Sequence, residues 1–85
     1  MLGIVEDVTP KISYTLGITA DVEISIYNLS AIKVATIFNG MQRPGKYTIW
    51  WNLKDDAGKK MPQGDYFAEV RIGTERYVRK RIVIP

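Results

Sequence analysis

The sequence predicts an all-β protein, an antiparallel β-sandwich of about seven short strands, in a single domain that covers residues 1–85. Apolar and polar residues alternate with a period of two in one segment after another, which is the pattern of strands that bury one face. Residues that favour turns, such as Gly, Pro, Asn and Asp, separate these segments at short intervals. With 85 residues the chain can build one hydrophobic core.

Three strands are expected in the first half of the chain. Residues 11–16 and 21–26 alternate strictly, and the polar turn 28–31 follows them. Residues 32–38 are rich in β-branched side chains, and Val34 is the expected core residue of that strand. The residues of the first two strands that are expected to face the core are Ile12, Tyr14, Leu16, Val22, Ile24 and Ile26.

The second half of the chain contains three further predicted strands, 46–52, 65–72 and 76–84. The alternation in the first of these places Trp51 on the inner face and Trp50 on the outer face. A loop bracketed by Asn39-Gly40 and by 43–45 is expected before the first of these strands, and a hairpin turn is expected at 73–75.

One corner of the sandwich is particularly clear in the sequence. Trp51 ends a strand, a polar turn closes on Gly58, and Gly64 admits a new strand that carries Tyr66. A buried Trp removes a large apolar area from water, which a small core needs. We therefore expect Trp51, Gly58, Gly64 and Tyr66 to have structural roles.

Composition excludes most catalytic and metal-dependent functions. The chain has no Cys and no His, so it has no thiol nucleophile, no disulfide, no thiolate metal site and no imidazole base. Asp55 and Asp56 do not form a catalytic carboxylate pair, because consecutive residues in a strand or turn point apart. We expect no enzymatic activity and no cofactor. No apolar run is long enough to span a membrane, and residues 1–7 lack the features of a signal peptide.

The net charge of +3 is unevenly distributed. Of the 12 basic and 9 acidic residues, seven basic but only three acidic ones follow Ala57. Such a basic stripe suits nucleic acid, an acidic polymer or a lipid surface. We favour a solvated strand face whose Lys and Arg residues prevent edge-to-edge pairing, and therefore expect a monomer without specific nucleic-acid binding.

Two sets of side chains are candidates for binding. Asn52, Asp55 and Asp56 crowd oxygen atoms into one turn, as Ca²⁺ would require, but these side chains also commonly cap the backbone of their own turn. We favour capping and expect no metal site. Trp50 is expected to be exposed near Phe67 on an adjacent strand, where aromatic rings could stack on polysaccharide or cover a partner domain; burial of Trp50 under its own loops is the alternative.

Four segments of the chain resemble the immunoglobulin-like domain of flagellar hook-capping proteins, and the resemblance extends from about Pro10 to the C-terminus. The pattern is also similar to C-terminal modules of secreted bacterial and archaeal proteins, including the sorting domains of Por (type IX) secretion. The segments are 27–37 (YNLSAIKVATI), 45–52 (GKYTIWWN), 55–59 (DDAGK) and 62–67 (PQGDYF). The resemblance implies an immunoglobulin- or fibronectin-like sandwich in which Trp51 and Tyr66 are core and corner residues.

The chain departs from the sorting domains at two places. It has Glu6–Pro10 where an Asn-Pro-rich segment is usual, and Ala31 where a turn Gly is usual. Both departures weaken the sorting interpretation and leave the fold unaffected.

The sequence therefore predicts a non-catalytic accessory or interaction module, the C-terminal domain of a larger secreted or cell-surface protein. Residues 1–9 are interpreted as a loosely ordered lead-in from an upstream domain. The expected partners are other domains of the parent protein or surface proteins. The alternatives are a carbohydrate-binding or secretion-sorting domain and a flagellar hook-assembly domain.

Overall fold

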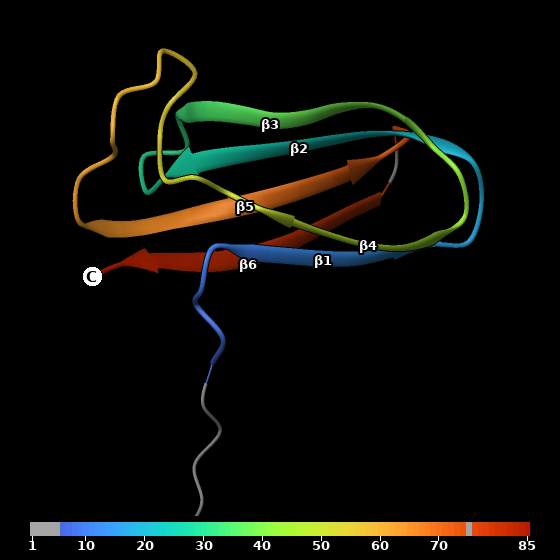
Figure 1. Cartoon of the computed structure of the whole chain (residues 1–85), viewed down its shortest axis with the longest axis horizontal. Helices are drawn as coiled ribbons and strands as arrows, with labels where there is room; N and C mark the ends of the chain where they lie inside the picture. The colour runs from blue at the N-terminus through green and yellow to red at the C-terminus, as the bar shows by residue number, and fades with distance from the viewer. Residues whose placement is uncertain (1–5, 75) are drawn as a thin grey trace, which may run out of the picture.

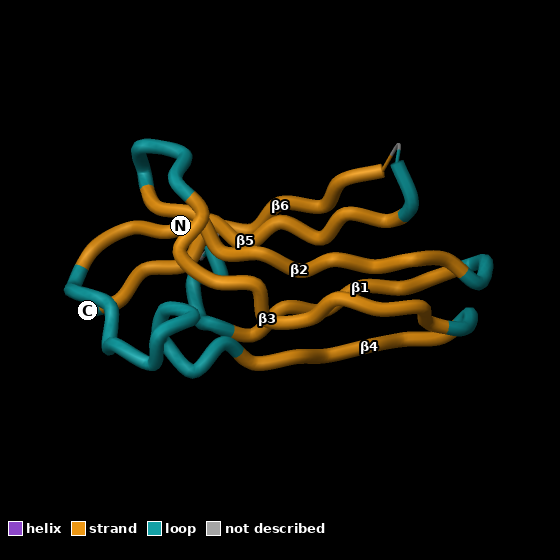
Figure 2. The backbone as a smooth tube through the Cα atoms, turned by 90° about the horizontal axis from the view of Figure 1, so that it is seen from above, coloured by secondary structure: helices purple, strands orange, loops and turns teal. Residues whose placement is uncertain are grey.

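The computed structural model describes residues 6–74 and 76–85, and these residues form an antiparallel β-sandwich. A two-stranded sheet in the order β1-β4 packs on a four-stranded sheet in the order β3-β2-β5-β6 (Figures 1 and 2). The predicted all-β sandwich is confirmed, with six strands in the described residues where about seven were expected. The strands are β1 (Lys11–Leu16), β2 (Ala20–Asn28), β3 (Lys33–Gln42), β4 (Gly45–Trp50), β5 (Gly64–Ile72) and β6 (Arg76–Ile84).

The core lies between the inner faces of the two sheets. Alternation along β1 and β2 places every second side chain there, and these are apolar, as the sequence pattern predicts. The Tyr14 and Tyr47 rings stack across the β1–β4 pair, with centroids 5.4 Å apart. The buried apolar residues are Ile12, Tyr14, Leu16, Val22, Ile24, Ile26, Ala35, Trp51, Tyr66, Ala68, Val70, Ile82 and Ile84.

Strand β3 differs from the prediction in its length and in its core residue. It continues through Asn39-Gly40, which we expected in a loop, and there Gly40 leaves room for the ring of Phe38. Val34 is only partly buried, and Ala35 is the core residue. The reason is that the register against β2 shifts twice, which leaves Ile37 and Val34 without partners on that strand. Each such bulge reverses the alternation that follows it.

The predicted corner joins β4 to β5. The Trp51 indole packs edge-on against Tyr66, with ring centroids 5.3 Å apart, and its Nε1–H donates to the carbonyl of Lys54 at 2.8 Å. The hydroxyl of Tyr66 donates to the carbonyl of Pro62 at 2.8 Å. Gly58 has a φ of 84°, a left-handed conformation that favours glycine. The loop between the sheets is thus held by the two aromatic residues that it encloses.

The chain enters the sandwich along the edge of β6. The N–H of Val83 donates to the carbonyl of Val8 at 3.0 Å, and the Lys80 ammonium donates to the carbonyls of Thr9 and Lys11 at 2.6 and 2.7 Å. Lys80 also forms an ion pair with Asp7, and the Asp7 carboxylate accepts hydrogen bonds from the N–H and the hydroxyl of Thr9. These contacts tie residues 7–11 to both sheets.

Residues 1–5 of the predicted lead-in, and Glu75 of the predicted hairpin 73–75, lie outside the described residues. Among the residues described, no helix is long and apolar enough to cross a membrane.

Candidate functional site

The turn that carries Asn52 and Asp55 uses their oxygen atoms to hold its own backbone. Asn52 Oδ1 accepts a hydrogen bond from the N–H of Lys54 at 3.0 Å. Asp55 Oδ1 accepts from the N–H groups of Ala57 and Lys59 at 3.0 and 2.8 Å. These are the contacts expected of Asx side chains that cap a turn.

Asp56 performs a different structural task, because it covers the free edge of β3. Its N–H donates to the carbonyl of Val34 at 3.2 Å, and its Oδ1 accepts from the N–H of Thr36 at 3.0 Å. One residue thereby satisfies two backbone groups beside a bulge in an edge strand. Within residues 6–74 and 76–85, no three His, Cys, Asp or Glu side chains are grouped as metal ligands.

Trp50 and Phe67 do not form one site. We expected them on adjacent strands, but β4 pairs with β1 and not with β5 in the described structure, so that expectation was wrong. Trp50 is 60% exposed on the outer face of the two-stranded sheet, beside an open groove of about 300 Å³ that Asn52 and Asp55 also line. Phe67 lies on the outer face of the other sheet, at the opposite side of the sandwich.

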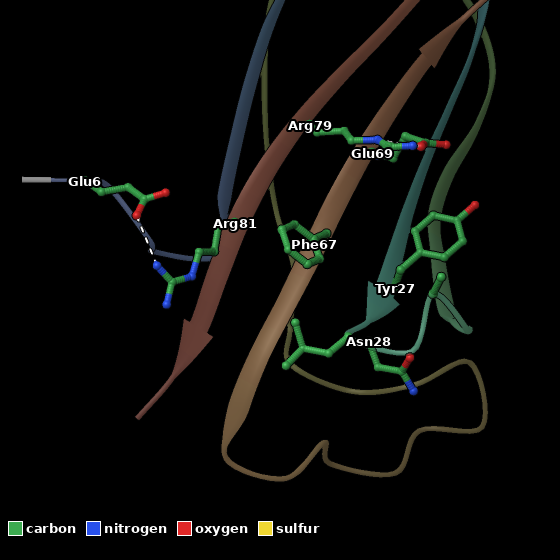
Figure 3. A pocket seen from close by; sticks show the side chains of 9 residues that line it. Glu6, Tyr27, Asn28, Phe67, Glu69, Arg79 and Arg81 are labelled. Atoms are coloured by element: carbon green, nitrogen blue, oxygen red, sulfur yellow. Dashed lines mark hydrogen bonds and ion pairs between the residues drawn. The ribbon is translucent and has the colours of Figure 1, made fainter.

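A second and larger groove lies over Phe67. It has a volume of about 660 Å³ and is open to solvent. Tyr27 faces Phe67 across the β2–β5 pair, and the side chain of Leu29, in the turn after β2, is 67% exposed beside them. Figure 3 shows the Phe67 ring with Tyr27 to its right, the Arg81–Glu6 pair to its left and the Arg79–Glu69 pair above it. We call this site the outer-face groove; it is lined by Glu6, Tyr27, Asn28, Leu29, Ala31, Phe67, Glu69, Arg79 and Arg81.

The turn that forms one wall of the groove is held tightly. Asn28 Oδ1 accepts from the N–H groups of Ser30 and Ile32 at 2.9 and 3.0 Å, and the backbone of Asn28 bonds to Ala31 and Ile32. These bonds keep Ala31 at a φ of 62°, in the left-handed region that disfavours residues with a Cβ. The exposed position of Leu29 therefore rests on a well-defined backbone.

Charges on this face are arranged in pairs. Glu23 accepts from Lys33 at 2.8 Å and lies 3.4 Å from Arg71. Glu69 accepts from Arg79 Nε at 3.2 Å. Arg81 lies 3.3 Å from both Glu6 and Asp65. Since these cations flank the carboxylates of the two central strands, the acidic groups are neutralised within the face.

The ion pair between Glu23 and Lys33 shifts the pKa of both groups. The hydrogen bond from Lys33, followed by one from Ser25, lowers the pKa of Glu23 below its ordinary value of 4.5. The same contact with Glu23 raises the pKa of Lys33 above 10.5. Both groups are therefore charged at neutral pH, and the pair covers Ser25, which is buried on this outer face.

Comparison with known protein families agrees with this fold. The family model for the FlgD Ig-like domain matches residues 5–75. The chain belongs to this family. FlgD Ig-like domains are non-catalytic structural or assembly domains of the flagellar hook-capping family, so the predicted immunoglobulin-like resemblance is confirmed. No curated protein and no solved structure matched the chain.

The family match does not extend to the secretion-sorting domains that the pattern also resembled. It ends before β6, so Arg79 and Arg81 lie outside the part of this FlgD Ig-like domain that the family model covers.

Sequence reasoning identified Phe67 and the basic residues of β6. It missed Tyr27, Leu29 and the acidic partners Glu23 and Glu69. Tyr27 and Glu23 occupy outward positions of β2, which the alternation shows. Their place beside Phe67 and Arg71 depends on the β2–β5 pairing, in which residues 40 and 48 positions apart become neighbours. The outward positions of aromatic and charged residues on each strand indicate these residues as candidates, but they do not show that the residues lie together.

Proposed function

We propose that this FlgD Ig-like domain is a non-catalytic interaction module that binds a partner protein through the outer-face groove. The observation that carries the proposal is the composition of that groove, an apolar centre of Phe67, Tyr27 and Leu29 with a charged rim. Aromatic and Arg residues around an apolar centre are typical of the energetically important part of protein interfaces.

The protection of the sheet edges favours a face over an edge as the contact surface. Asp56 bonds to the edge of β3, and Val8 and Lys80 occupy part of the edge of β6. Edge strands covered in this way do not readily pair with another chain. A partner would therefore meet side chains, and the outer-face groove, with a volume of about 660 Å³, offers a concave surface for them.

Two more specific versions of this function have separate support. The family match favours a module for flagellar hook assembly. The sequence pattern favours the other version, an accessory module of a larger secreted or cell-surface protein. Exposed Trp50 and its neighbouring polar groove favour polysaccharide binding as a second function, on the opposite face.

Site-specific photo-crosslinking in the parent protein, in its native cell, tests the proposal. A photoreactive phenylalanine at position 67 should form a discrete protein adduct, whereas the same group at position 50 should not. Mass spectrometry of the adduct would identify the partner, and a hook protein would support the assembly version. The proposal is wrong if position 67 gives no protein adduct, or if only position 50 gives one. Affinity electrophoresis of the wild-type protein and of Trp50→Ala would test polysaccharide binding separately.

A further inference from the structure

We infer that the outer-face groove recognises an acidic segment of the partner that carries an apolar side chain between its carboxylates. This inference rests on the proposed function, because it names the chemistry of the partner at the same groove. Three features of the face carry it. The cations paired with the central-strand carboxylates are more exposed than those carboxylates, the terminal amino groups of Arg79 can donate to a second carboxylate, and the centre of the groove is apolar.

Positive and negative side chains are exposed to different degrees on this face. The carboxylates of the central strands are mostly covered, with exposed side-chain fractions of 23% for Glu23 and 17% for Glu69. Their cationic partners are far more exposed, at 42% for Lys33, 49% for Arg71 and 73% for Arg79. At these central-strand pairs an approaching molecule therefore meets ammonium and guanidinium groups before carboxylates. The order is reversed at the rim, where Glu6 is 59% exposed and its partner Arg81 44%.

Arg79 retains the geometry needed to bind a carboxylate. Among the described residues, its hydrogen bond and its ion pair to Glu69 both run through Nε. The two terminal amino groups of a guanidinium can still donate in parallel to a second carboxylate, in the bidentate arrangement that Arg favours. Glu69 meanwhile holds the guanidinium in place, which lowers the entropic cost of using it.

The centre of the groove accepts an apolar group. Phe67 is 37% exposed, and Leu29 and Tyr27 stand beside it. A groove of about 660 Å³ has room for several side chains of an extended segment. Burial of one apolar side chain against Phe67 would place flanking acidic residues beside Arg79 and Arg81 on β6, which lies next to β5.

Nucleic acid and anionic lipid fit the same face less well. Both bind cations through their phosphates, whereas the centre of this groove is apolar. Neither polymer supplies the isolated apolar side chain that the centre would bury. A protein segment with alternating acidic and apolar residues satisfies both requirements.

The test is an NMR titration of the isotopically labelled 85-residue domain with a short synthetic peptide of alternating glutamate and leucine. Chemical shifts should change at Phe67, Arg79 and their strand neighbours. The variants Arg79→Glu and Phe67→Ser should each weaken binding roughly tenfold or more. The matched controls Lys46→Glu and Trp50→Ser, exposed residues on the other sheet, should change the affinity less than about twofold. Melting temperatures would show that all four variants are folded.

Three results would overturn the inference. They are binding of a lysine–leucine peptide as tight as that of the glutamate–leucine peptide, an affinity unchanged by Arg79→Glu, and tighter binding of a single-stranded oligonucleotide or of anionic lipid vesicles at this face. Failure of the peptide together with a protein adduct at position 67 would refute the acidic chemistry and leave the proposed function standing. Absence of both the adduct and peptide binding would refute both.

Discussion

The two outer faces of this sandwich have different organisations, although each carries an exposed aromatic residue. On the four-stranded sheet, Phe67 lies among side chains from three neighbouring strands, with charged pairs on two sides. On the two-stranded sheet, Trp50 stands opposite Lys11 and is 60% exposed, and the outward hydroxyls of Ser13 and Thr48 bond to each other at 3.2 Å.

The difference follows from the width of the sheets. A residue in a central strand has cross-strand neighbours on both sides, so a carboxylate such as Glu23 can be placed between cations from two directions. Both strands of a two-stranded sheet are edges, and each outward residue has a cross-strand neighbour on one side only. The wider sheet can therefore build a defined, charge-patterned groove, whereas the narrower one presents a ring with little lateral support.

The largest expected difference in stability is between substitutions of two adjacent residues, Trp51 on the inner side of the narrow sheet and Trp50 on its outer side. Trp51→Ala should lower the free energy of unfolding by about 3–5 kcal/mol, because it removes a buried indole and leaves a cavity beside Tyr66. Trp50→Ala should lower it by less than about 1 kcal/mol, since that ring is mostly in water. Denaturant midpoints measure both values. Similar losses for the two variants would mean that Trp50 is covered, and the contrast between the two faces would disappear.

The sequence predicts regular strands well and their exceptions poorly. Alternation along residues 46–52 is sufficient to separate Trp51 from Trp50, because β4 has no bulge and Trp51, which follows it directly, still donates its N–H to the carbonyl of Pro10. The same rule selects Val34 instead of Ala35, since the two bulges in β3 leave no clear sign in a run of β-branched residues.

Contacts between residues far apart in the sequence were the other feature that the sequence did not predict. Capping of its own turn by Asp55 is a local contact that residue types suggest. The bond of Asp56 to Thr36, and the separation of Trp50 from Phe67, depend on which strands pair across the molecule. The sequence of a single strand shows which of its side chains face inward and which face outward. The residues that line the outer-face groove can be grouped only when the order of the strands is also known.

A smaller effect distinguishes the two exposed aromatic residues. Phe67→Ala should lower the free energy of unfolding by about 1–2 kcal/mol, more than Trp50→Ala, because nearly two thirds of Phe67 is covered and it contacts Tyr27 across the strand pair. A double-mutant cycle with Tyr27→Ala should show a favourable coupling of about 0.5 kcal/mol or more. A cycle without coupling, or a loss at Phe67 no greater than that at Trp50, would show that the wider sheet gives its aromatic residue no additional support.

The smallest expected effect concerns the charged pairs that lie on the wide face among the described residues. Glu23→Gln removes the attraction to Lys33 and Arg71 and keeps an acceptor for Ser25, so its cost at neutral pH should be below about 1 kcal/mol. Because folding lowers the pKa of Glu23, the contribution of the pair is complete above the ordinary value of 4.5 and is lost as the pH falls through the lower folded value. The raised pKa of Lys33 keeps that partner charged up to at least pH 10.5.

The stability difference between the wild-type protein and Glu23→Gln should therefore be constant from about pH 6 to pH 9 and shrink toward zero under acid. It should also shrink in high salt, which screens partly exposed charges. Chemical denaturation at a series of pH values measures it, with Lys46→Gln on the narrow face as the matched control that should show no such acid dependence. If the difference persists undiminished at a pH well below 4.5, the contribution of Glu23 comes from packing or neutral hydrogen bonds, and the electrostatic contrast between the two faces is wrong at this position.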